Sequence, residues 1–108
     1  MEQHEIQDVI NGILSAMKGQ VDSIILFGSV ARGNNDDESD VDIAFIFNGK
    51  KSAEQEDALV DYFVEMDLKY DKIYSIIDIE KEQFDKWKNA SPFYKNIIKE
   101  GIVLWKAA

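Results

Sequence analysis

Two aspartates and a glycine–serine pair are the residues of this chain whose types and spacing could support chemistry. Gly28 and Ser29 follow a short apolar segment whose composition favours a β-strand. After ten further residues, Asp40 and Asp42 open a second apolar run that ends at Phe47. Because side chains alternate along a strand, we expect the two carboxylates on one face, roughly 7 Å apart along the chain.

This combination favours phosphoryl or nucleotidyl transfer. Two carboxylates held side by side repel each other unless a cation lies between them, and the stretch from Asn34 to Asp42 holds five acids and no Lys or Arg. Mg²⁺ is the usual cation, because it takes one or two carboxylates and completes its shell with substrate phosphates. A Gly-Ser turn between a strand and a helix would offer those phosphates backbone N–H groups and a hydroxyl. Either half alone is also typical of an ordinary turn or a solvated strand start.

The segments GSVARG and SDVDIAF together resemble the signature of the polymerase-β-type nucleotidyltransferase superfamily, which is Gly-Ser, about ten residues, then Asp-x-Asp. The resemblance covers residues 22–47 well and the remainder as a pattern of elements. The small chain is similar to the minimal nucleotidyltransferases (MNT family) often encoded beside a HEPN-domain partner. This resemblance implies transfer of AMP from ATP with Mg²⁺. It also implies that the protein is an antitoxin that adenylylates a HEPN ribonuclease toxin.

The resemblance also implies roles for individual residues. Asp40 and Asp42 would be catalytic metal ligands. Gly28 would let the backbone approach the nucleotide, and the hydroxyl of Ser29 would hold the β- or γ-phosphate. Arg32 would either contact a phosphate or pair with the acidic loop that follows it.

Superfamily members usually carry a third carboxylate on the neighbouring strand, often as the general base. A third strand predicted over residues 70–79 offers Asp71 and Asp78. We expect Asp71 to be the third catalytic metal ligand, because it would share a strand face with Ser75 while Asp78 would point to the other side. An alternative alignment places Ser75 at this position and leaves no acid there.

The elements that would position these residues alternate between helix and strand. Apolar spacing, caps and turn residues predict helix 6–17, strand 22–27, short helix 29–32, strand 40–47, helix 53–67, strand 70–79, helix 80–88, helix 92–99 and an extended segment 102–105. This order predicts an α/β fold with a small mixed sheet flanked by helices, which is the nucleotidyltransferase fold of the family resembled. The third strand is the expected neighbour of the second.

Composition limits the class of protein and its partners. The 108 residues suffice for one domain, residues 1–108, with a single modest core. A net charge of −9, with Lys and Arg scattered, argues against long nucleic acid as a substrate and suits docking on a basic protein. The chain has no Cys and no apolar run near the ~20 residues needed to span a bilayer. We therefore expect a cytoplasmic protein without membrane association.

Three functions remain open at this stage. The first is transfer of AMP from ATP to a tyrosine or other hydroxyl of a HEPN toxin. The second is modification of a small hydroxylated molecule such as an aminoglycoside. The third is a non-catalytic acidic module that masks a basic partner. Only about 60 residues follow the second strand, so we expect the acceptor to be presented by a partner or by a homo-oligomer.

Overall fold

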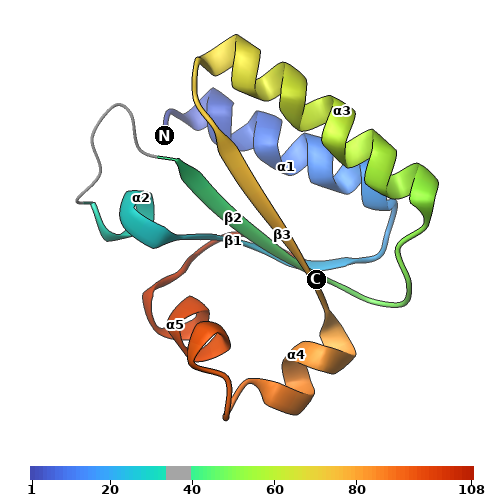
Figure 1. Ribbon diagram of the computed structural model, residues 1–108, viewed down its shortest axis with the longest axis vertical. Helices are drawn as coiled ribbons and strands as arrows, with labels where there is room; N and C mark the ends of the chain where they lie inside the picture. Colours follow the sequence, from blue (N-terminus) through green and yellow to red (C-terminus); the bar gives the residue numbers. More distant parts are fainter. Residues whose placement is uncertain (34–39) are drawn as a thin grey trace.

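The computed structural model describes residues 1–33 and 40–108, which form a four-stranded mixed sheet with helices on both faces (Figure 1). In chain order the elements are α1 (Gln3–Met17), β1 (Val21–Phe27), α2 (Gly28–Arg32), β2 (Val41–Phe47), α3 (Ala53–Tyr70), β3 (Tyr74–Glu80), α4 (Lys81–Trp87), α5 (Pro92–Glu100) and β4 (Ile102–Lys106). The predicted α/β class and the mixed sheet are confirmed.

The order of the strands is β3-β2-β1-β4. β1 pairs antiparallel with both β2 and β4, whereas β2 pairs parallel with β3. This confirms the third strand as the neighbour of the second. The registers place Asp42 opposite Phe27 on one side and opposite Ser75 on the other. The end of β1, the start of β2 and the start of β3 therefore meet at one end of the sheet.

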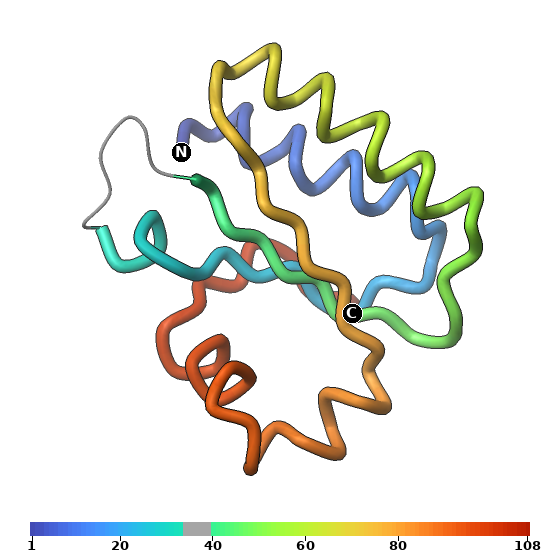
Figure 2. Tube along the Cα trace, viewed as in Figure 1, coloured from blue at the N-terminus to red at the C-terminus, as the bar shows by residue number. Residues whose placement is uncertain are grey.

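One face of the sheet carries the larger hydrophobic core. The four β2 side chains that alternate with Asp42 along the strand are all buried here, namely Val41, Ile43, Phe45 and Phe47. Helices α1 and α3 run side by side across this face (Figure 2). A Cβ at Gly12 of α1 would overlap the ring of Tyr62, so the missing side chain lets the two helices approach closely.

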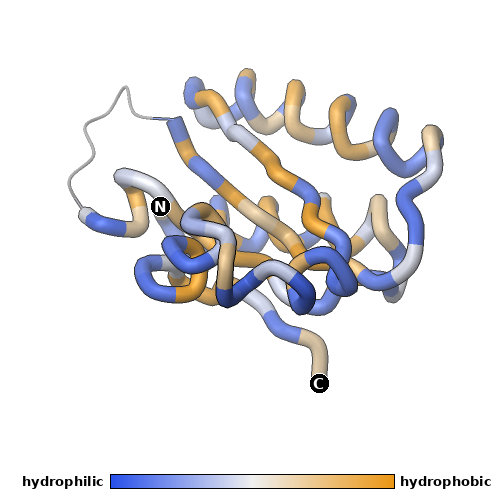
Figure 3. The backbone as a smooth tube through the Cα atoms, turned by 60° about the horizontal axis from the view of Figure 1, so that its bottom comes forward, coloured by the Kyte–Doolittle hydropathy of each residue, from blue (hydrophilic) through white to orange (hydrophobic). Residues whose placement is uncertain are grey.

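The opposite face carries a smaller core beneath α4 and α5. Ala44 and Ile46 of β2 pack there with Phe84 of α4 and Ile97 of α5. Asp42 has the same strand parity as Ala44 and Ile46, so its side chain lies on this face. Hydropathy along the backbone shows the arrangement, with largely hydrophobic strands in the middle and helices of mixed character around them (Figure 3).

The main departure from the predicted elements lies between α3 and β3. Helix α3 begins with a complete capping box between Ser52 and Gln55 and continues to Tyr70, three residues beyond the predicted end. It stops at Asp71, which adopts a left-handed conformation with φ 52°. The strand consequently starts at Tyr74, and the placement of Asp71 on a strand face is wrong.

Candidate functional site

Gly28 is the point where the two halves of the motif touch. It is the first residue of α2, directly after β1, and its φ of +75° belongs to the left-handed region that favours glycine. A Cβ at this position would overlap the carboxylate oxygen Oδ2 of Asp42. Both the backbone conformation and the close approach of this carboxylate therefore require glycine here.

Asp40 and Asp42 form the acidic half of the site. Asp42 is half-buried on β2, and Asp40 is exposed just before that strand. Burial raises the pKa of Asp42, the negative charge of Asp40 raises it further, and the positive charge of Arg32 lowers it in part. The carboxylate of Asp40 is thus close enough to Asp42 to disfavour ionisation of Asp42.

This donor set fits a hard cation such as Mg²⁺. Paired carboxylate oxygens in a partly desolvated position are the ligands that Mg²⁺ uses, with substrate phosphates and water in the remaining positions. Within residues 1–33 and 40–108, no cluster of three or more His, Cys, Asp or Glu is arranged to hold a metal. In this described part of the chain, Asp40 and Asp42 are therefore the carboxylate ligands available for such a cation.

Ser29 and Arg32 both lie on the short helix α2. The backbone carbonyl of Ser29 accepts a hydrogen bond from the N–H of Gly33, which closes the helix. The guanidinium of Arg32 forms an ion pair of 3.5 Å with Glu100 at the end of α5, and both side chains are nearly half exposed. The alternative partner predicted for Arg32, the acidic loop, falls on residues 34–39, which lie outside the described residues.

The structure does not bring a third carboxylate beside the pair in its described part. Asp71 sits in the turn that ends α3, and the position on β3 opposite Asp42 is Ser75. Asp78 lies opposite Phe45 further along the strand and forms an ion pair of 2.9 Å with Lys51. The register therefore agrees with the alternative alignment, in which Ser75 takes this position.

Phe93 is a neighbour of the site that the sequence analysis missed. Its ring packs edge-on against that of Phe27, with 5.7 Å between ring centroids, and Phe27 directly precedes Gly28. Phe93 belongs to α5, far from the motif in sequence. No spacing within the motif could have pointed to it, because only the folding of α5 onto this face brings the two rings together.

Comparison with known proteins agrees with this geometry. The family model described as Polymerase beta, Nucleotidyltransferase matches residues 9–108. The chain belongs to this nucleotidyltransferase family. A candidate protein adenylyltransferase of Methanocaldococcus jannaschii is 35% identical over 104 residues, which is 96% of this chain and 98% of the relative. A second such protein of the same organism is 33% identical over 76 residues, covering 70% of this chain and 77% of the relative.

A crystal structure of a toxin–antitoxin with AMP-PNP shares the fold of this nucleotidyltransferase. The TM-score is 0.64 at 20% identity, over 94% of this chain and 73% of the other. The MntA–HpeT toxin–antitoxin with two aspartate-to-glutamate changes gives the same TM-score at 18% identity, with the same coverage. The chain is thus a nucleotidyltransferase similar to protein adenylyltransferases. Within residues 1–33 and 40–108, no helix combines the length and apolar character needed to cross a membrane.

Proposed function

We propose that this nucleotidyltransferase transfers AMP from ATP to a tyrosine hydroxyl of a HEPN-type toxin in a Mg²⁺-dependent reaction, and that it thereby acts as an antitoxin. The observation that carries the proposal is the carboxylate of Asp42 held against Gly28, next to Asp40. Its support from comparison is the similarity to candidate protein adenylyltransferases along nearly the whole chain.

In the proposed reaction the acceptor hydroxyl attacks the α-phosphorus of ATP. A new oxygen–phosphorus bond forms, the bond to the bridging oxygen breaks, pyrophosphate leaves in line, and the hydroxyl proton passes to solvent. Mg²⁺ at this site would neutralise phosphate charge and orient the reacting oxygens. Asp40 and Asp42 would hold it, and the absence of a side chain at Gly28 leaves room for the carboxylate of Asp42.

The residues of α2 would bind the triphosphate. The hydroxyl of Ser29 would donate a hydrogen bond to the β- or γ-phosphate, and the missing side chain of Gly28 lets the carboxylate of Asp42 lie directly against the backbone that would approach the nucleotide. Arg32 would exchange its partner Glu100 for a phosphate oxygen, because a half-exposed ion pair is worth only about 0–1 kcal/mol. Asp71 stays a predicted third ligand, without a contact that supports it.

A protein acceptor suits the charge of this chain. With a net charge of −9, the molecule attracts a basic protein and repels a nucleic-acid backbone. Its structural neighbours include toxin–antitoxins, which supports a toxin as the partner. The HEPN class of that toxin, the tyrosine acceptor and Mg²⁺ rest on the family resemblance.

The proposal is tested by the intact mass of the protein encoded by the adjacent gene, after incubation with the chain, ATP and Mg²⁺. We expect added mass in units of AMP, and none with Asp40→Asn/Asp42→Asn. Glu82→Gln/Asp85→Asn serves as a charge-matched control, because it removes two exposed carboxylates of α4. Toxin neutralisation that survives Asp40→Asn/Asp42→Asn at full strength would instead identify a masking module.

A further inference from the structure

Helix α3 carries an apolar stripe on its solvent side. Val60, Val64 and Leu68 follow one another at intervals of four residues and therefore lie on one helix face. Their exposed fractions are 51%, 52% and 81%, and Ile73, just beyond the helix, is 59% exposed. Single exposed apolar residues are common, but an aligned set on one helix is typical of a surface that binds a partner.

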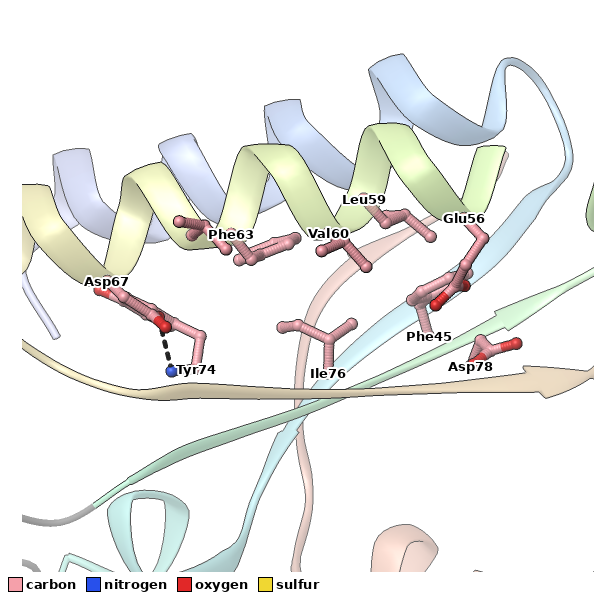
Figure 4. Close-up of a pocket in the computed structure, with 10 residues that line it drawn as sticks. Phe45, Glu56, Leu59, Val60, Phe63, Asp67, Tyr74, Ile76 and Asp78 are labelled. Atoms are coloured by element: carbon pink, nitrogen blue, oxygen red, sulfur yellow. Dashed lines mark hydrogen bonds between the residues drawn. The ribbon is translucent and has the colours of Figure 1, made fainter. Parts of the chain in front are cut away.

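A groove runs alongside this stripe, between α3 and the edge strand β3. Its volume is about 250 Å³, and its lining residues are Phe45, Glu56, Leu59, Val60, Phe63, Val64, Asp67, Tyr74, Ile76 and Asp78. Val60 and Ile76 face each other across the middle, whereas carboxylates occupy both ends (Figure 4). The groove thus offers an apolar floor between acidic ends.

The charges around the groove select a basic occupant. Asp67 accepts a hydrogen bond of 3.0 Å from the backbone N–H of Tyr74. At the other end, Glu56 and Asp78 share the single ammonium group of Lys51. Three more acids of α3, Asp57, Asp61 and Glu65, are exposed. A second copy presenting the same face would bring like charges together, which disfavours symmetric self-association here.

The groove lies across the edge strand from the candidate active site. Ile76 lines the groove, while its neighbour Ser75 projects from the opposite face, opposite Asp42. The exposed Ile73 is tied to the start of β2 by a hydrogen bond of 2.8 Å between its carbonyl and the N–H of Val41. The groove opens on the α3 face of the sheet and Asp42 projects from the other face, so a protein seated in the groove reaches Asp42 by passing around the edge strand β3.

We propose that this groove and the stripe Val60–Val64–Leu68 dock a basic amphipathic helix of the protein that accepts AMP, so that its hydroxyl is delivered to Asp40 and Asp42. The identity of the docked protein as the acceptor rests on the function proposed above. Apolar side chains at intervals of three and four residues would fill the groove, and flanking Lys or Arg would meet Asp67 and the exposed acids of α3.

The test compares two matched double variants of the full chain. Val64→Gln/Leu68→Gln removes two of the three side chains of the stripe, 52% and 81% exposed. Ile98→Gln/Val103→Gln removes two other exposed apolar side chains, 56% and 57% exposed, on α5 and β4. Titration calorimetry with the protein encoded by the adjacent gene should show binding at least about tenfold weaker for the first variant and within about twofold of wild type for the second. The KM for this acceptor should rise for the first variant while the KM for ATP stays unchanged.

Equal weakening by both variants, or by neither, overturns the proposal. So does a wild-type dimer in light scattering that only Val64→Gln/Leu68→Gln dissociates, because the occupant would then be a second copy. Asp40→Asn/Asp42→Asn separates this proposal from the proposed function, since it should abolish transfer and leave binding intact. A wild type that binds without transferring AMP refutes the function alone, and the two double variants still decide the docking.

If the protein encoded by the adjacent gene does not bind, the probe is a synthetic helix with Leu on one face and Lys on its flanks. Binding that is lost in Val64→Gln/Leu68→Gln, and with a peptide whose Lys residues are replaced by Glu, supports the groove as a site for basic helices. No binding of the Lys peptide to wild type overturns it.

Discussion

Glu5 and Asp42 are carboxylates on opposite faces of the sheet, and their surroundings shift their pKa values in opposite directions. Glu5 lies in the first turn of α1 and is 2% exposed. It accepts a hydrogen bond from the hydroxyl of Tyr74 and two, of 3.0 and 3.1 Å, from the ammonium of Lys72. Burial raises the pKa of Glu5, but these hydrogen bonds and the charge of Lys72 outweigh it, and the pKa is lowered. For Asp42, burial and the charge of Asp40 both raise the pKa.

The difference separates a carboxylate that stabilises the fold from one that costs stability. The lowered pKa of Glu5 means that its ionised form contributes stability above its ordinary pKa, and that this contribution disappears as the pH falls through the folded-state value. The raised pKa of Asp42 has the opposite sign, so stability is lost as the pH rises through its folded-state value. An incompletely neutralised carboxylate is a usual mark of a site that binds a cation or substrate.

Removing the acidic pair should have the largest effect on activity. We expect Asp40→Asn/Asp42→Asn to lower the rate of AMP transfer by at least about a hundredfold, because the site would lose the charge that holds Mg²⁺. The free energy of unfolding at pH 7 should not fall, since the variant removes the repulsion that raises the pKa of Asp42. Single-turnover transfer and urea unfolding measure the two quantities. If the transfer rate and the free energy of unfolding both fell, Asp42 would stabilise the fold as Glu5 does, and the contrast between them would be wrong.

Gly28→Ala should damage both activity and stability. The new Cβ would meet the carboxylate of Asp42, and an alanine held at the φ of +75° would be strained. We expect a loss of about 2 kcal/mol in unfolding free energy and at least about tenfold in transfer rate. Gly49→Ala is the control for φ alone, because Gly49 has φ +80° with only the side chain of Gln20 nearby, at 3.5 Å. Equal transfer rates in Gly28→Ala and Gly49→Ala would contradict a role for the close approach of Asp42 to Gly28.

Glu5→Gln should destabilise the fold and leave the chemistry unchanged. The variant leaves the ammonium of Lys72 without its buried partner, which we expect to cost about 2 kcal/mol at pH 7. The pH dependence of stability should weaken in the acid range, where the wild type loses the contribution of ionised Glu5. Urea unfolding from pH 3 to 7 tests this expectation. If Glu5→Gln lost stability at low pH as steeply as wild type, this pH dependence would come from another titratable group.

Asp71→Asn should have the smallest effect. Asn tolerates the left-handed conformation at φ 52°, and the structure places Asp71 in the turn after α3 and not opposite Asp42. We expect transfer within about tenfold of wild type, measured as for the acidic pair. A loss as large as that of Asp42→Asn would instead make Asp71 the third ligand.

The sequence was most informative where local spacing determines the structure. The Gly28-Ser29 turn, the strand that begins beside Asp42 and the position of β3 next to β2 were all predictable, because strand alternation and element order specify them. The end of α3 was not, because Leu68 to Tyr70 continue the helix and Asp71 takes the unusual left-handed cap. That shift changed the expected partner of Asp42 from an aspartate to Ser75.

Contacts between distant segments could not be predicted in the same way. The bonds of Glu5 to Lys72 and Tyr74 join the first turn of α1 to the start of β3. The ring of Phe93 arrives beside Phe27 only through the path of α5. Neither has a local signal in the sequence, since each depends on how helices pack on the finished sheet.

The most direct test of the contrast between the two carboxylates is the shift in Tm caused by Mg²⁺ together with AMP-PNP, a non-hydrolysable analogue of ATP. We expect the Tm of wild type and of Glu5→Gln to rise by similar amounts, because a ligand that binds only the folded state stabilises it. The Tm of Asp40→Asn/Asp42→Asn should not rise. An equal rise in all three proteins would show that the acidic pair does not hold the metal–nucleotide complex.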